Sequence, residues 1–311
     1  MANCFKSMCG SKPQRSGEHR FEEVWQHNEI KFDGPPSALQ LRTGEVQIDS
    51  FESIEDTKDN AGSCGTLIIT NMRLIWTLND RSNLSIGLDC IVSLKAEEVF
   101  SKVHIYSQGL LCKAHFDGTS FEHIFTAPAE SSLRLLHVAQ AVFENCGTTK
   151  LYRDLRVKDD AIIRGKELVP LLHEQVYDKL GDIVSLSGSN HQGVLGTLII
   201  TNIRTVWFAE LSQEYATSIP YLQMERVYVT VRPTGQKALV IETTASSGSY
   251  RLGFRSDPID HVEEVCAQIA DTGKAFFAAP IFGVEPPAPP PVEPPVPPPV
   301  EPPVPPPVEP P

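Results

Sequence analysis

The sequence predicts a mainly β protein with some α-helix, organised as two similar domains in tandem, each a small barrel or sandwich closed by a C-terminal amphipathic helix. The first observation behind this prediction is a repeat, because GTLIITNMRLIW at residues 65–76 returns as GTLIITNIRTVW at residues 196–207. The second is the alternation of apolar and polar residues inside the repeat, which is typical of a half-buried strand. The third is a stripe of apolar residues at helical spacing near the end of each copy.

The repeat extends well beyond these twelve residues. GEVQIDS (44–50) aligns with HEQVYDK (173–179), SIGLDCIVSL (85–94) with SIPYLQMERV (218–227), and FEHIFTAP (121–128) with YRLGFRSDP (250–258). The offset between the copies drifts by only a few residues, as small differences in loop length would cause. We infer an internal duplication whose copies, at about 130 residues each, have a common size for a single domain.

The predicted organisation has four parts. Residues 1–20 lack apolar periodicity and are expected to form a flexible extension. Residues 21–150 and 151–284 are expected to be the two domains. Residues 285–311 repeat a proline octad and hold 17 of the 26 prolines, so they are expected to form a polyproline II tail.

Inside each domain the repeated segment predicts a β-hairpin. Leu67 and Ile69 alternate with more polar neighbours, Asn71 suits a turn, and the alternation resumes toward Trp76. Packing in the core is the favoured interpretation of Trp76 and Trp207, and a platform for a ligand is the alternative.

A terminal helix is predicted in each copy. In the second copy Asp257 and Pro258 suit a helix start, and the expected buried stripe is Val262, Val265, Cys266 and Ile269. In the first copy Pro128 takes the matching place, and the expected stripe is Leu133, Leu136, Gln140 and Phe143. Several short strands followed by one amphipathic helix indicate the pleckstrin-homology type of architecture.

Composition excludes several classes of function. The formal net charge is −12 without any run of Lys and Arg, which argues against nucleic acid as a partner. The seven cysteines are scattered, with no C-x-x-C pair, so neither a disulfide framework nor a metal site is expected, and the thiols suit the cytoplasm. Familiar catalytic and cofactor motifs are missing, so we predict no catalytic residues, no cofactor and no enzyme activity.

The sequence also resembles a known family along most of its length. The resemblance is carried by VWQHNEIKFD (24–33), GEVQIDSFESIEDTKDN (44–60), LYRDLRVK (151–158), HEQVYDKL (173–180), SIPYLQ (218–223), ALVIE (238–242), APIFGV (279–284) and both copies of the repeated segment. These segments are similar to the family of the fifth Bardet–Biedl syndrome protein, the pleckstrin-homology-like subunit of the BBSome ciliary coat. The proline octads depart from the acidic, mixed tail of that family.

The resemblance implies a non-enzymatic role in ciliary traffic. A BBSome subunit would help to move membrane proteins into and out of cilia or flagella, in protein transport linked to ciliogenesis and intraflagellar transport. It would have the other BBSome subunits as partners and contact a phosphoinositide-containing membrane. Its expected places are the cytoplasm, the basal body at the ciliary base and the ciliary membrane. The alternative function is a freestanding phosphoinositide-binding adaptor that acts outside a coat.

The candidate lipid contacts are Lys58, Arg73, Lys179 and Arg204. The two loops that follow the first long strand of each copy, DSFESIEDTKDNAGSCG (49–65) and DKLGDIVSLSGSNHQG (178–193), contain few cations, so neither predicts a strongly basic cradle. Arg73 and Arg204 occupy equivalent positions, and a strand arginine near a turn is more often the partner of an acid or a carbonyl than of a lipid.

Three other segments carry predictions about contacts. Six cations form the densest basic stretch, at Lys150, Arg153, Arg156, Lys158, Arg164 and Lys166, and a solvated linker is favoured there over a membrane contact. The proline tail could dock on an SH3 or WW type of domain, and a plain spacer is the alternative. Cys4 and Cys9 are candidates for acylation, which as a single signal anchors weakly.

Overall fold

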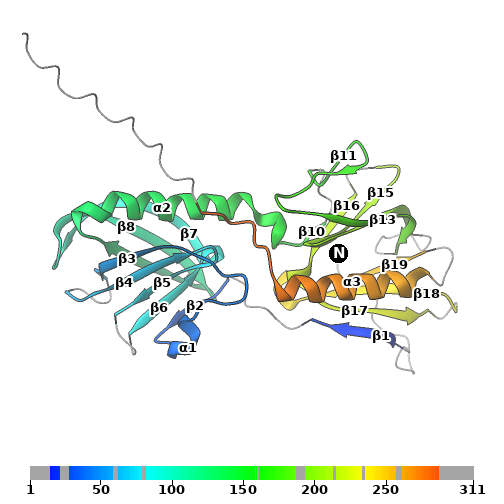
Figure 1. Cartoon of the computed structure of the whole chain (residues 1–311), viewed down its shortest axis with the longest axis horizontal. Helices are drawn as coiled ribbons and strands as arrows, with labels where there is room; N and C mark the ends of the chain where they lie inside the picture. The colour runs from blue at the N-terminus through cyan, green and yellow to red at the C-terminus, as the bar shows by residue number, and fades with distance from the viewer. Residues whose placement is uncertain are drawn as a thin grey trace, which may run out of the picture.

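The computed structural model describes residues 15–21, 28–58, 62–78, 82–157, 159, 161–186, 193–212, 215–232, 235–256 and 261–286. These residues form two lobes joined by a long helix that starts on the first lobe and points toward the second (Figure 1). In this described part no helix is long and apolar enough to cross a bilayer.

The first lobe is built on an antiparallel sheet of eight strands, in the order β2-β6-β5-β4-β3-β9-β8-β7. Its elements are β2 (Ile30–Phe32), α1 (Pro36–Leu39), β3 (Gln47–Asp56), β4 (Cys64–Thr70), β5 (Arg73–Thr77), β6 (Asn83–Gly87), a 3₁₀ turn (Leu88–Cys90), β7 (Ile91–Ser101), β8 (Ile105–Phe116), β9 (Thr119–Thr126) and helix α2 (Ala129–Thr148). Helix α2 packs on the buried face of this sheet and closes the lobe.

The second lobe has a sheet of nine strands, in the order β1-β17-β18-β19-β13-β14-β15-β16-β10. Its elements are β10 (Arg156–Val157), the small pair β11 (Ile163–Arg164) and β12 (Glu167–Leu168), β13 (Val176–Ser185), β14 (Val194–Thr201), β15 (Arg204–Ala209), β16 (Ala216–Pro220), β17 (Met224–Val231), β18 (Lys237–Thr243), β19 (Arg251–Arg255) and helix α3 (His261–Ala278). Single 3₁₀ turns lie at Lys150–Tyr152, Tyr221–Gln223 and Ala245–Ser247. The remaining strand, β1 (Arg15–Arg20), comes from the N-terminal side of the first lobe.

The strand orders confirm the duplication predicted from the sequence. The segment β6-β5-β4-β3-β9-β8-β7 of the first sheet returns as β16-β15-β14-β13-β19-β18-β17 in the second, and a helix follows the last strand each time. In the part that the structure describes, the outer strands of each sheet do not pair with one another, so the two sheets are open layers rather than closed barrels.

The repeated twelve residues form the predicted hairpin in both lobes. Leu67 pairs with Trp76 across β4 and β5, and Leu198 pairs with Trp207 across β14 and β15. Both indoles are buried, and their Nε1 atoms donate hydrogen bonds of 2.9 and 3.0 Å to the carbonyls of Ile54 and Ile183. The core interpretation of the two tryptophans is therefore confirmed.

The helix predictions were right for α3 and shifted for α2. Val262, Val265, Cys266 and Ile269 of α3 are all buried, whereas Asp257 and Pro258 lie outside the described residues. In α2 the prediction that Leu133 belongs to the buried stripe was wrong, because its side chain is 72% exposed. The buried stripe of α2 consists of Ser132, Leu135, Leu136, Val138, Ala139, Val142 and Cys146. Because the buried stripe begins at the polar residue Ser132, the apolar residues alone indicated the wrong starting position.

Both ends of the described chain cross to the opposite lobe. Residues 15–20, placed in a flexible extension by the sequence, instead form β1, which pairs antiparallel with β17. Phe21 continues into the core of the second lobe, where only a glycine at position 273 leaves room, since a Cβ there would lie 2.4 Å from the ring. The apolar periodicity that marks most strands is absent from RSGEHR, so backbone pairing, the Phe21 anchor and the ion pairs of Glu18 with Arg226 and Arg20 with Glu225 hold this strand.

At the other end, the segment after α3 returns to the first lobe (Figure 1). Phe282 is buried in the second core and Val284 in the first, and the amide of Asn145 donates to the carbonyl of Glu285 at 3.3 Å. Gly44 allows this approach, because a Cβ there would lie 2.8 Å from the ring of Phe282. The two lobes are thus connected by more than the linker between them.

Candidate functional site

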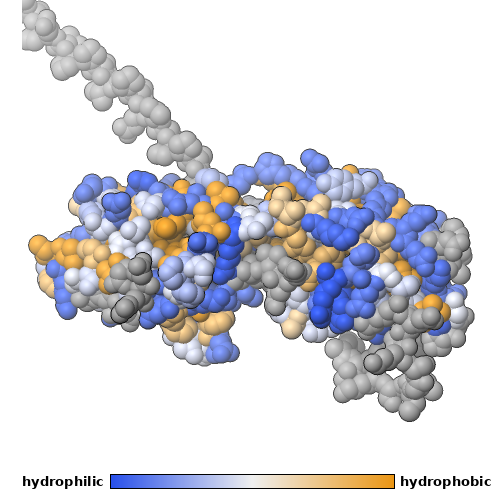
Figure 2. All heavy atoms as spheres, turned by 60° about the horizontal axis from the view of Figure 1, so that its bottom comes forward, coloured by the Kyte–Doolittle hydropathy of each residue, from blue (hydrophilic) through white to orange (hydrophobic). Residues whose placement is uncertain are grey.

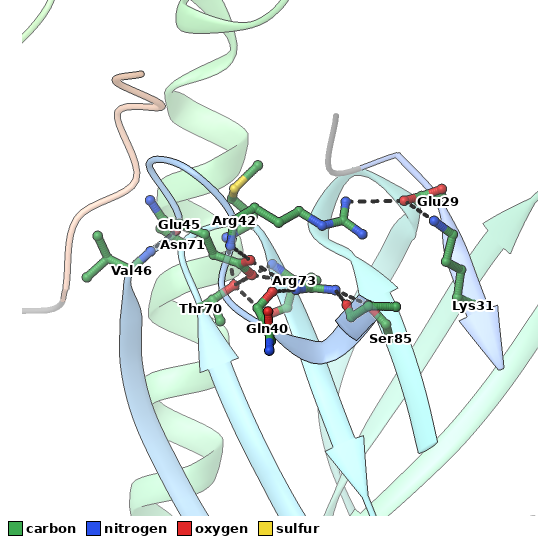
Figure 3. Close-up of polar contacts among 12 residues, drawn as sticks. Glu29, Lys31, Gln40, Arg42, Glu45, Val46, Thr70, Asn71, Arg73 and Ser85 are labelled. Atoms are coloured by element: carbon green, nitrogen blue, oxygen red, sulfur yellow. Dashed lines mark hydrogen bonds and ion pairs between the residues drawn. The ribbon is translucent and has the colours of Figure 1, made fainter. Parts of the chain in front are cut away.

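The predicted lipid ligand Arg73 lies inside a buried network of hydrogen bonds (Figure 3). Its Nε donates to one carboxylate oxygen of Glu45 at 2.8 Å and its Nη2 to the other at 3.0 Å. The remaining donors reach the carbonyls of Ala38 and Gln40 and the hydroxyl of Ser85. Neither side chain of the Arg73–Glu45 pair has any exposed surface, so the guanidinium is fully used within the protein.

The second lobe repeats the same arrangement around Arg204. Its Nε and Nη2 donate to the two carboxylate oxygens of Glu174 at 2.7 and 2.9 Å, and its Nη1 donates to Ser218 at 3.2 Å. This pair is also completely buried. The assignment of Arg73 and Arg204 as lipid contacts is therefore corrected: a guanidinium without exposed surface cannot reach a phosphate, and its role here is to join parts of each lobe.

The turn of each hairpin explains why the arginine is held in this place. Thr70 Oγ1 donates to Glu45 and accepts hydrogen bonds from the backbone N–H groups of Met72 and Arg73. The side chain of Asn71 bonds to the backbone on either side of Glu45, at Gly44 and Val46. The motif T-N-x-R with a glutamate upstream recurs in both copies, and this paired recurrence of Glu45 and Glu174 was the sequence signal for the network.

The other two candidates, Lys58 and Lys179, are exposed and lie in different lobes. Lys58 Nζ is 3.1 Å from a carboxylate oxygen of Glu122, and Lys179 Nζ is 2.8 Å from one of Glu167. Each ammonium already faces an acid, and Lys113, whose Nζ is 3.3 Å from the other carboxylate oxygen of Glu122, is a second lysine beside Lys58. His191, the other basic residue of the second loop, lies outside the described residues.

In the first lobe a buried carboxylate organises the loop that follows β3. Glu55 accepts hydrogen bonds from the N–H of Gly62 and the hydroxyl of Ser101, which connects this loop to the turn after β7. Burial alone would raise the pKa of Glu55, but the hydrogen bonds from Ser101, Gly62 and neighbouring backbone N–H groups outweigh it and lower the pKa below its usual value. A fixed negative charge beneath the loop is the opposite of what a phosphate group requires.

The lowered pKa of Glu55 predicts a pH-dependent contribution to stability. Because the carboxyl is more acidic in the folded protein than in the unfolded chain, its contribution is present above the unfolded pKa and is lost as the pH falls through the folded pKa. We expect Glu55→Gln to lower the free energy of unfolding at pH 7 by about 1–3 kcal/mol. The difference between the two proteins should shrink below about pH 4, and urea unfolding from pH 3 to pH 7 measures it. A constant difference at every pH would contradict this role for the charge.

An open hollow of about 460 Å³ lies beside the hairpin formed by β4 and β5. It is lined by Pro36, Leu39, Glu52, Ser53, Cys64, Gly65, Thr66, Thr77 and Leu78. Glu52 is the one charged side chain in this set, so the hollow offers an acid and no cation to a ligand. Its chemistry does not suit a phosphoinositide headgroup.

The basic stretch between the lobes is solvated only in part, because Lys150, Arg164 and Lys166 are exposed whereas Arg153 is not. Arg153 is buried, and its guanidinium donates to the carbonyl of Cys146 at 2.7 Å and to the carbonyl of Phe282 at 2.8 Å. Gln223 in turn donates to the backbone carbonyl of Arg153 at 2.6 Å. Arg153 therefore fastens the end of α2, the returning C-terminal segment and the second lobe together. Lys158 lies outside the described residues.

Two family models match the chain in tandem. The N-terminal PH-like domain of the Bardet-Biedl syndrome 5 protein matches residues 45–147, and the second PH-like domain of the same protein matches residues 156–286. The chain belongs to the Bardet-Biedl syndrome 5 family. This membership confirms the predicted fold class of two tandem pleckstrin-homology-like domains, with the correction that the sheets are open.

Relatives in distant animals align over the same part of the chain. "BBSome complex member BBS5" of Xenopus laevis is 39% identical over 266 residues, which cover 85% of this chain and 72% of the relative. The Homo sapiens protein of that name is 38% identical and is covered to 77%. "BBSome complex member bbs-5" of Caenorhabditis elegans is 37% identical over 273 residues and is covered to 74%.

One solved structure shows a weaker likeness. The Vps36 N-terminal PH domain aligns with 38% of this chain and 96% of its own length, at 20% identity and a TM-score of 0.30. At that score the alignment supports no conclusion about site or function.

Proposed function

We propose that this protein is a non-enzymatic subunit of a BBSome, a coat that carries membrane proteins into and out of cilia or flagella. The observation that supports this most strongly is the similarity to proteins named as BBSome complex members, which extends through both lobes at 37–39% identity. The partners in this proposal are the other BBSome subunits. The protein acts in the cytoplasm, at the basal body and at the ciliary membrane as a peripheral component.

The geometry favours this coat role over a freestanding phosphoinositide adaptor. Two of the four candidate cations are buried in ion pairs, and the other two face carboxylates in separate lobes. A protein that binds phosphoinositides on its own needs several converging cations to hold a multivalent phosphate. Contact with phosphoinositides therefore belongs, in this proposal, to the assembled coat and its combined surface.

Affinity purification tests the coat role. The tagged full-length chain is purified under mild conditions from ciliated or flagellated cells, and the recovered proteins are quantified by mass spectrometry. We expect the other BBSome subunits in amounts comparable to the tagged chain. Recovery of the chain alone, from cells that express those subunits, would overturn the proposal and favour the freestanding adaptor.

Charge reversal at the two exposed lysines gives a separate prediction about lipid. We expect the double variant Lys58→Glu, Lys179→Glu to bind phosphoinositide vesicles as the unmodified chain does, because each ammonium already has an acidic partner. Flotation with vesicles of the purified complexes, one with each form of the chain, measures this, because the contact belongs to the assembled coat. The matched control is the double variant Lys31→Glu, Lys274→Glu, which reverses two other exposed lysines that are paired with Glu29 and Asp271. Loss of flotation in the Lys58→Glu, Lys179→Glu variant alone would restore these lysines as lipid contacts.

The proline tail keeps its two interpretations, an SH3 or WW type of partner or a spacer, because residues 287–311 lie outside the described part. The same holds for acylation at Cys4 and Cys9. The described cysteines at positions 90, 112, 146 and 266 are buried, and burial raises the pKa of each thiol, to about 12 for Cys112 and about 11 for the others. Buried thiols of this kind suit packing rather than chemistry.

A further inference from the structure

The outer edge of β7 is an open edge of the first sheet. β7 is 11 residues long and pairs with β8 on one side, and no strand in the described part of the chain pairs with its other side. A long open edge presents a row of backbone N–H and C=O groups, which are a template for another strand.

The equivalent edge of the second lobe is covered by the chain itself. β17 corresponds to β7 in the repeat, and β1 pairs with it antiparallel, with Arg15 opposite Thr230 and Arg20 opposite Arg226 (Figure 1). The next residue, Phe21, packs against Phe277 of α3, with ring centroids 5.4 Å apart. An extended segment therefore fits between this sheet edge and the terminal helix, and β1 shows the mode of binding that the fold allows.

The β7–β8 hairpin has an apolar end that its counterpart lacks in the described residues. The ladder between β7 and β8 continues to the pair Ser101 and Ile105, whereas the ladder between β17 and β18 stops at Val231 and Lys237. Phe100 and Tyr106 are 63% and 83% exposed, with ring centroids 5.6 Å apart.

The exposed side chains of Val103 and Ile105 also belong to the apolar end of the β7–β8 hairpin. Apolar side chains gather at the end of the first lobe that is farthest from the second lobe (Figure 2). Ile105 also holds a φ of 61°, which is strained for a β-branched residue. Exposed apolar side chains beside an open sheet edge indicate a surface that binds a partner rather than one that stays in contact with water.

The charges on β7 indicate what kind of segment it would accept. Glu97 and Glu98 are adjacent and exposed near the end of the strand. By the repeat, Glu97 takes the place of Thr230, which lies opposite β1. Successive side chains of a strand point to opposite faces of the sheet, so a segment that pairs with β7 as β1 pairs with β17 would carry one basic residue beside Glu97 on one face and another beside Glu98 on the other.

We propose that the edge of β7 binds an extended segment of another coat subunit, which adds antiparallel to the sheet and carries Lys or Arg facing Glu97 and Glu98. The mode is strand addition, with backbone hydrogen bonds for affinity and side-chain contacts for specificity. The inference rests on the proposed function, because the partner segment belongs to a subunit of the same coat.

Hydrogen exchange of the full-length chain, alone and in the complex purified from ciliated cells, tests this inference. In the chain alone we expect the amides of residues 92–98 to exchange faster than those of residues 225–231, which β1 covers. In the complex, exchange at residues 92–98 should slow by about tenfold or more. Recovery of the subunits with unchanged exchange at β7 overturns the inference and leaves the proposed function standing. Failure to recover the subunits overturns both.

Two further outcomes identify a different occupant and also overturn the inference. Protection of residues 92–98 that rises with the concentration of the chain alone would mean pairing with a second copy. Protection that appears only with phosphoinositide vesicles would mean a membrane contact.

A pair of charge variants tests the choice of partner. We expect Glu97→Lys, Glu98→Lys to weaken the partner's affinity by about tenfold while the melting temperature stays unchanged. The matched control is Glu263→Lys, Glu264→Lys, an adjacent exposed pair in the first turn of α3. An equal loss in both variants would show a general effect of charge and contradict the proposed contact. Retained affinity in the β7 variant would also contradict it.

Discussion

Replacing Arg73 by methionine is expected to lower the free energy of unfolding by about 3–5 kcal/mol, one of the largest effects of any single change in the first lobe. The substitution removes two of the hydrogen bonds to Glu45 and leaves its carboxylate buried without the positive charge of Arg73. The same change at Arg204 should have a similar effect in the second lobe, because Glu174 is equally enclosed. Urea unfolding followed by tryptophan fluorescence measures both.

The control for this prediction is an ion pair at the surface. Arg134 pairs with Asp49, but its side chain is 62% exposed, so Arg134→Met should cost no more than about 1 kcal/mol. The double variant Arg73→Met, Glu45→Met should be more stable than Arg73→Met alone, since it leaves no buried charge. If Arg73→Met and Arg134→Met had equal effects, the buried pair would not be the structural element described here.

Replacing Phe282 by alanine is the second change with a large expected effect, at about 3–5 kcal/mol. Phe282 follows α3 on a segment without helix or strand, yet its ring is buried in the second core and lies against the backbone position of Gly44. The variant should lose core packing and also loosen the C-terminal segment that carries Val284 into the first core. Thermal unfolding and limited proteolysis of the full-length chain measure both consequences.

A matched control is Phe100→Ala, which removes an aromatic ring of the same size from an exposed position. It should change the free energy of unfolding by less than about 0.5 kcal/mol. A small effect of Phe282→Ala, comparable to this control, would mean that the returning segment does not contribute to the core.

Much of the fold could be predicted because the sequence contains two copies of the same domain. Trp76 and Trp207, on matching strands, indicated the same core position, and the alternation on either side of Asn71 indicated a hairpin with its turn at that residue. The partners of the arginines were harder to predict, since they lie about 30 residues upstream and pair only after the sheet has formed. Burial of a charged side chain depends on such distant partners and is poorly marked by local pattern.

The remaining differences between the predictions and the structure arise where a segment packs on the lobe that is distant from it in the sequence. RSGEHR has no strand pattern of its own, and its pairing with β17 depends on an edge far along the chain. Arg153 resembles its solvated neighbours in sequence, but the carbonyls of Cys146 and Phe282 enclose it. The candidate lipid contacts were predicted from charge and position alone, and neither quantity reports whether a side chain reaches the surface.

The crossing of the two chain ends also constrains how the protein is made. During synthesis an N-terminal domain usually folds as soon as it leaves the ribosome. Here β1 emerges long before β17, the strand that it pairs with, and the first core gains Val284 only when nearly all of the described chain has been translated. Neither lobe can be complete in a nascent or prematurely terminated chain. The complete fold therefore forms only after translation has passed residue 284.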